Sequence, residues 1–78
     1  NYPLGIANYQ KILKIAQSAN DSVWLSKAFN YIGVMYENKG DFDKSLSNHF
    51  TALKIRENIK NQHGIGASYL NIGIAYSS

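Results

Sequence analysis

An internal repeat constrains this chain more than any other feature. Shifting the sequence by 40 residues (69 − 29) places FNYIGVMY, residues 29–36, over YLNIGIAY, residues 69–76. The same shift places ILKI at 12–15 over ALKI at 52–55, so two separate parts of the chain report one period. Self-similarity at a fixed period of about 20 to 50 residues is typical of arrays that stack one small structural unit repeatedly.

Each unit has the apolar spacing of helices. Apolar side chains recur at steps of three and four residues, which winds them onto one stripe of a helix. The first stripe comprises Leu4, Ile6, Tyr9, Ile12, Leu13 and Ala16. The second comprises Trp24, Leu25, Ala28, Phe29, Ile32, Met35 and Tyr36, and the third comprises Phe42, Leu46, His49, Phe50 and Leu53, continuing to about Lys60. The sequence therefore predicts an all-α fold of antiparallel helices joined by short turns.

Helix start and stop signals support these boundaries. Asp21 and, one period later, Asn61 can accept hydrogen bonds from the free amides of a first helical turn. Gly40 can take the left-handed conformation that closes a helix, and Asp41 can cap the next one. We expect 1–20 to be the second helix of a preceding unit, 21–60 a complete unit, and 61–78 the first helix of a following unit.

These residues resemble the tetratricopeptide repeat, whose signature includes W-x-x-L-G-x-x-Y. F-x-x-I-G-x-x-Y at 29–36, followed by GDF at 40–42, fits that pattern, and Y-x-x-I-G-x-x-Y at 69–76 starts a second copy. The resemblance implies an alpha-alpha superhelix, a solenoid of antiparallel helix pairs. It also implies that Gly33 and Gly73 mark close approaches between helices. The 40-residue length is similar to that of repeats in bacterial signalling proteins, including histidine kinases and transcriptional regulators.

The resemblance implies a function on a surface, because the first helices of stacked units line a concave trough. The residues expected to face that trough and bind a partner are Lys27, Asn30, Tyr31, Val34, Glu37, Asn38, Leu70, Asn71 and Ile74. A partly apolar trough suits a peptide or helix with hydrophobic anchors. We expect a non-catalytic scaffold that binds a protein or peptide. The alternative is a sensory or regulatory segment of a larger signalling protein. A third interpretation is that the apolar trough residues only pack on a neighbouring unit or protomer.

Composition narrows the remaining classes. The 78 residues include no cysteine, which removes disulfides, zinc thiolates and a cysteine nucleophile. Eight Lys and Arg against five Asp and Glu give a net charge of +3. The cations are scattered rather than gathered into a basic stripe, and Lys11, Lys14, Lys54 and Arg56 fall on second helices that should line the outside, so we expect no nucleic-acid partner. Apolar runs are too short for a membrane span, and the compartment stays open between cytoplasm and periplasm.

No group of residues has the spacing of a catalytic or metal site. The stretch ENKGDFD, 37–43, clusters three carboxylates, but a calcium loop counted from Asp41 would need glycine at Leu46 and glutamate at Ala52. We read it as a corner between helices, with Phe42 as an inward anchor. His49 has no partner ligand three or four residues away, so we expect no metal, cofactor or enzymatic activity.

The two ends of the chain should be incomplete. A repeat cannot bury its flat face alone, and about three units are needed for stability. One full unit flanked by two halves leaves Ile72 and Tyr76 at one end, and Ile6 and Leu13 at the other, in need of partner helices. We therefore expect an excerpt of a longer array and self-association through its open ends.

Overall fold

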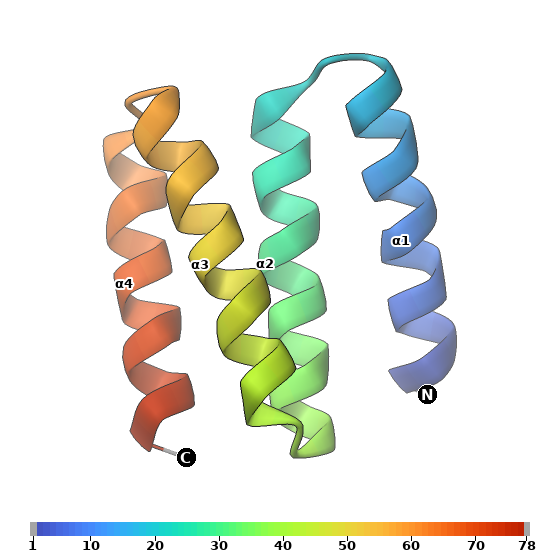
Figure 1. Ribbon diagram of the computed structural model, residues 1–78, viewed down its shortest axis with the longest axis vertical. Helices are drawn as coiled ribbons and strands as arrows, with labels where there is room; N and C mark the ends of the chain where they lie inside the picture. Colours follow the sequence, from blue (N-terminus) through green and yellow to red (C-terminus); the bar gives the residue numbers. More distant parts are fainter. Residues whose placement is uncertain (1, 78) are drawn as a thin grey trace.

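The chain folds into four helices and is all-α, as the sequence predicts. The computed structural model describes residues 2–77 and contains no strand among them. The helices are α1 (Tyr2–Ser18), α2 (Ser22–Lys39), α3 (Phe42–Asn58) and α4 (Gln62–Ser77). Consecutive helices run antiparallel (Figure 1). The side chains of Leu4 and Ile6, expected on the first apolar stripe, lie outside the described part of the structure.

All three turns end a helix in the same way. The backbone is left-handed at Asn20 (φ 57°), Gly40 (φ 91°) and Lys60 (φ 57°). In each case the amide of the following residue donates to the carbonyl five positions back at 2.9 Å, as Asp41 does to Tyr36. This pair of features is the Schellman motif, which satisfies the last free carbonyls of a helix. The turns therefore recur every 20 residues (40 − 20 and 60 − 40), half of the sequence period.

The same turns also begin the next helix. The side chain of Asp21 accepts a hydrogen bond from the amide of Trp24 at 3.1 Å. Asn61, one period later, accepts one from the amide of Gly64 at 3.0 Å. Asp41 caps α3 likewise, accepting from the Lys44 amide at 3.3 Å. The expected caps are confirmed, and each turn needs only two or three residues because its stop and start signals are adjacent.

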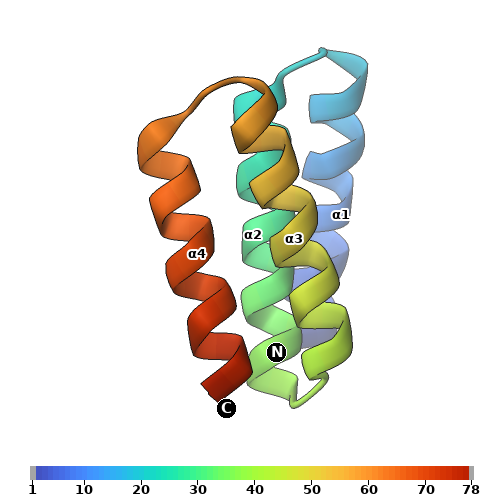
Figure 2. The ribbon, with the colours of Figure 1, turned by 60° about the vertical axis from the view of Figure 1, so that its left-hand side comes forward.

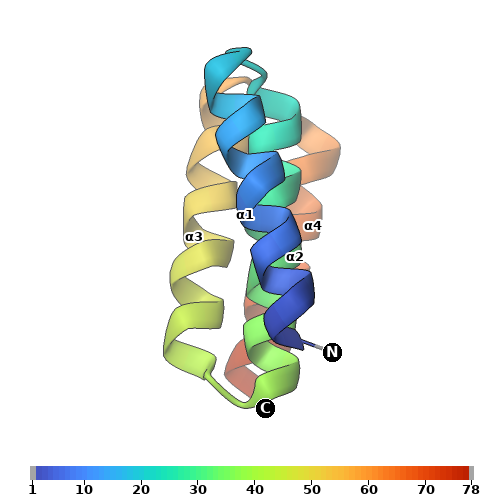
Figure 3. The same cartoon turned by 90° about the vertical axis from the view of Figure 1, so that its right-hand side faces the viewer.

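The helices pack mainly on their neighbours in the chain. α2, α3 and α4 contact one another, whereas α1 contacts α2 alone among the described helices. α1 and α3 both lie against α2 (Figure 2). In the view from the side that carries α1, α3 is seen to the left of α1 and α4 to the right, and α4 packs on α3 behind α1 (Figure 3). The two helices that the sequence predicts to be first helices, α2 and α4, are therefore near each other at one surface.

The core is made of small and polar side chains. Its buried apolar residues are Ala16, Ala28, Ile32, Ala52, Leu53, Ile72 and Ala75. Its buried polar residues are Ser26, Ser45, His49, Arg56 and Ser68. His49 is the largest fully buried side chain, and a Cβ added at Gly33 would lie 2.8 Å from its Cε1 atom. Glycine is required there because any side chain would meet the imidazole ring, which explains the close approach of α2 and α3.

The close approach expected at Gly73 involves no helix of this chain, because a Cβ there would meet no atom within 4 Å. Three other details of the sequence interpretation are wrong. Phe42 is not an inward anchor but is 37% exposed. Ile72 needs no outside partner because it is already buried, although Tyr76 is exposed as expected. Arg56, expected to line the outside with the other cations of the second helices, is buried in the contact between α3 and α4.

Candidate partner-binding face

Asn30 and Asn71 join the two helices that carry the expected binding residues. The Asn71 side-chain amide donates to the Asn30 side-chain oxygen at 2.6 Å, linking the middle of α4 to the middle of α2. Both side chains are half-buried. Residues 41 positions apart in sequence thus meet at the line where α2 and α4 adjoin. The bond holds the two helices in one register, so that side chains on either side of it share one face.

Tyr31 lies on the α2 side of this pair and is held by α1. Its ring stacks on the ring of Tyr9, with the centroids 5.1 Å apart and the planes at 25°. The ring is still 46% exposed, so one side of it remains open to solvent. Such offset aromatic pairs contribute about 0.5–1.5 kcal/mol beyond the area they bury. Tyr31 is therefore a partly exposed aromatic surface whose position is fixed by the ring of Tyr9.

Lys27 lies one helical turn before Tyr31. Its ammonium nitrogen lies 5.2 Å from the centroid of the Trp24 ring, within the range of a cation–π contact. Both side chains are exposed. The contact restrains the lysine near the aromatic ring, and it places one positive charge at the α1–α2 end of the face.

The apolar part of the face comes from both helices. Val34 is half-buried on α2, whereas Leu70 is 66% exposed and Ile74 is also exposed on α4. Leu70 immediately precedes Asn71, and Ile74 follows it by one turn. An exposed leucine and isoleucine beside a half-buried valine give hydrophobic surface on either side of the asparagine pair. Asn38, near the end of α2, is exposed.

Glu37 does not belong with these residues. Its carboxylate is only 18% exposed and lies 4.0 Å from the Nε2 atom of His49 on α3. Burial, with a smaller contribution from the positive charge of Arg56, lowers the pKa of His49 below its ordinary value. The neutral imidazole is therefore the form that the fold favours. Glu37 is directed toward the α2–α3 contact and not toward a solvent-exposed trough.

Arg56 is the structural residue that sequence reasoning missed. Its Nη1 atom donates to the hydroxyl oxygen of Ser68 at 2.8 Å and to the carbonyl oxygen of Gly64 at 3.2 Å. Burial lowers its pKa from the ordinary value. Both acceptors lie on α4, so Arg56 fixes the position of α4, and hence of Leu70 and Asn71, relative to α3. Its spacing of seven residues from His49 (56 − 49), on the same helix stripe, was the available signal.

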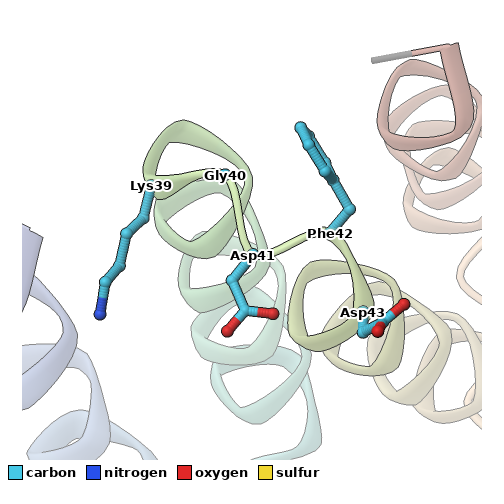
Figure 4. A pocket seen from close by; sticks show the side chains of 5 residues that line it. All are labelled: Lys39, Gly40, Asp41, Phe42 and Asp43. Carbon is cyan, nitrogen blue, oxygen red and sulfur yellow. The ribbon is translucent and has the colours of Figure 1, made fainter.

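The corner at 39–43 is a shallow surface hollow rather than an ion site. In Figure 4 the carboxylates of Asp41 and Asp43 lie apart and do not converge, and the ring of Phe42 extends away from them. Asp41 is engaged as the cap of α3 and lies 3.8 Å from the Lys44 ammonium. Within residues 2–77, no three His, Cys, Asp or Glu side chains form a group that could hold a metal ion. The interpretation of ENKGDFD as a corner agrees with this geometry.

Comparisons with known proteins add no family to this picture. No protein-family model, curated protein or solved structure matches the chain. None of the helices within the described residues combines the length and the hydropathy that a membrane span requires.

Proposed function

We propose that this chain is a non-catalytic protein-interaction module of the tetratricopeptide type, which binds a peptide or a helix across the surface shared by α2 and α4. The binding residues are those of the expected trough apart from Glu37. We define them as the trough face: Lys27, Asn30, Tyr31, Val34, Asn38, Leu70, Asn71 and Ile74. The partner is a protein segment with hydrophobic anchors.

The Asn30–Asn71 hydrogen bond is the observation that carries this proposal. The Asn71 amide group donates to the Asn30 side-chain oxygen at 2.6 Å, which fixes the relative register of α2 and α4. A binding surface assembled from two helices needs such a constraint, because ordering the surface on binding would cost free energy. The buried Arg56, bonded to α4 at two points, constrains the same helix from the opposite side.

The chemistry of the trough face favours an amphipathic partner. Exposed Leu70 and the open side of Tyr31 offer apolar contact on opposite sides of a polar pair. Burying such surface contributes about 25 cal/mol per Å², while the asparagines can bond to polar groups of the partner. The single cation nearby, Lys27, gives a weak preference for an acidic residue at one end of the ligand. A phosphate-rich partner would require a cluster of cations instead.

The experiment is a peptide selection followed by substitution. A random peptide library is selected on the chain, and the affinity of the best peptide is measured by isothermal titration calorimetry. Leu70→Gln should weaken binding at least tenfold, because it removes an exposed anchor without touching the core. Phe50→Gln is the matched control, since Phe50 is an exposed apolar residue on α3. Equal affinities for both variants, with folding intact, would refute the assignment of the trough face.

A further inference from the structure

The two end helices each carry half of an interface that already exists inside the chain. α3 lies against α2, with the His49 ring over Gly33 and the Lys44 ammonium 5.4 Å from the centroid of the Tyr36 ring. Because the sequence repeats every 40 residues, α4 corresponds to α2 and α1 corresponds to α3. The burial of equivalent positions can therefore be compared directly.

On α4 the positions equivalent to the covered face of α2 are open. The four pairs are Ser26 and Gly66, Phe29 and Tyr69, Gly33 and Gly73, and Tyr36 and Tyr76. Every α2 member is buried or half-buried, and every α4 member is exposed. A Cβ at Gly66 or Gly73 would meet no atom within 4 Å. We call Gly66, Tyr69, Gly73 and Tyr76 the α4 docking face; it is distinct from Leu70 and Asn71 of the trough face.

On α1 the positions equivalent to the buried face of α3 are also less covered. The four pairs are Gly5 and Ser45, Tyr9 and His49, Ile12 and Ala52, and Ile15 and Ile55. Every α1 member is more exposed than its α3 counterpart, and Ile15 is 68% exposed. We call Tyr9, Ile12 and Ile15 the α1 docking face. Gly5 is left out because a Cβ there would lie 3.0 Å from the Met35 side chain of the same chain. An apolar cavity of about 290 Å³ adjoins this face and is lined in part by Ile12, Ile15 and Trp24.

We propose that a second copy of this chain docks its α1 against α4, in the register in which α3 packs on α2. A second copy is the occupant that fits, because each copy holds both complementary halves of one interface and the α2–α3 contact shows how they pack. In this register Tyr9 of one copy lies over Gly73 of the next, where His49 lies over Gly33 within a chain. Gly73, like Gly33, has no Cβ, so a ring can approach the helix backbone there.

Charge does not oppose this docking. α4 contains no Asp, Glu, Lys or Arg between Gln62 and Ser77. The two lysines of α1, Lys11 and Lys14, are exposed and belong to neither docking face. No ionised side chain of a docking face is therefore buried by the contact.

The contact is heterologous, since different surfaces of the two copies meet. Each added copy presents a new α4 docking face, so association continues beyond the dimer unless the array closes into a ring. The association does not depend on what the trough face binds. It is measured by sedimentation velocity of the 78-residue chain from low micromolar to submillimolar concentration, where the average mass should rise past that of a dimer.

Two variants each block one end. Gly73→Gln fills the α4 docking face at a position where a side chain meets nothing within its own chain, and it raises helix propensity. Ile15→Gln removes an exposed anchor of the α1 docking face. Each variant alone should associate at least tenfold more weakly than the wild type, with unchanged helicity by circular dichroism. Phe50→Gln, on neither face, should associate as the wild type does.

Mixing the two variants distinguishes this arrangement from a symmetric one. Gly73→Gln retains an intact α1 and Ile15→Gln an intact α4, so an equimolar mixture should form dimers of one of each and stop there. A wild-type chain that stays monomeric throughout overturns the proposal. A self-limiting dimer that survives in either variant alone, because it joins two α1 or two α4 helices, overturns it as well.

Discussion

Gly33 and Gly73 occupy equivalent positions of the repeat but should respond oppositely to alanine. A Cβ at Gly33 would lie 2.8 Å from Cε1, 2.9 Å from Nε2 and 3.0 Å from Nδ1 of His49. Carbon atoms prefer separations of about 3.5–4.0 Å, and the fully buried ring has little space to withdraw. Overpacking of this kind costs about 1–3 kcal/mol.

Helix propensity acts in the same direction at both positions. Replacing glycine by alanine inside a helix stabilises it by about 0.5–1 kcal/mol. At Gly73 nothing opposes that gain, so Gly73→Ala should raise the free energy of unfolding by about 0.5–1 kcal/mol. At Gly33 the overpacking outweighs it, so the two variants should differ by about 1–3 kcal/mol, with Gly33→Ala the less stable.

Urea unfolding followed by circular dichroism measures this difference, at concentrations low enough for the chain to be monomeric. Introducing Gly33→Ala in a His49→Ala background should remove most of its cost, because the ring that it meets is gone. Two variants of equal stability would refute the reasoning. The same would follow if the cost of Gly33→Ala persisted unchanged without the imidazole.

Two further predictions concern the buried polar residues. Arg56→Ala removes the hydrogen bonds to Ser68 and Gly64 and should lower the free energy of unfolding by about 1.5–3 kcal/mol. The control, Lys54→Ala, changes an exposed side chain and should alter the free energy of unfolding by less than about 0.5 kcal/mol. Equal effects of the two variants in urea titrations would contradict the role of Arg56. Burial lowers the pKa of His49 in the folded chain, so the unfolded chain binds the proton more tightly. The free energy of unfolding should therefore be highest above the unfolded pKa of about 6.5 and should fall as the pH drops below that value. Urea midpoints measured between neutral pH and about pH 5 should show this decline, with a smaller slope in His49→Gln than in the wild type, and an unchanged slope would contradict it.

Helix boundaries could be predicted from the sequence because their determinants are local. Asp21, Asp41 and Asn61 cap the helices that follow them, and Gly40 ends α2. The left-handed residues Asn20 and Lys60 could not be predicted in this way. Non-glycine residues seldom adopt that conformation, and only the hydrogen bonds of the complete turn reveal it.

The internal positions of charged and polar residues were harder to predict than the helices. Arg56 was assigned to the outside because it lies on a second helix of the repeat, although its spacing from His49 placed it on the buried stripe. Glu37 was assigned to the trough because it lies off the core stripe of its helix, but its carboxylate lies beside the imidazole of His49 on α3. Sequence reasoning named Asn30 and Asn71 separately, and their pairing follows only from the way α4 packs beside α2.

The most direct test of the interaction function is to map a bound peptide residue by residue. Amide chemical shifts of isotope-labelled chain are followed while the selected peptide is added, at concentrations where the chain is monomeric. The proposal predicts that the largest shifts fall on α2 and α4 around Tyr31, Val34, Leu70 and Asn71. Shifts confined to α1 and α3, or to the exposed ring of Phe50, would contradict it.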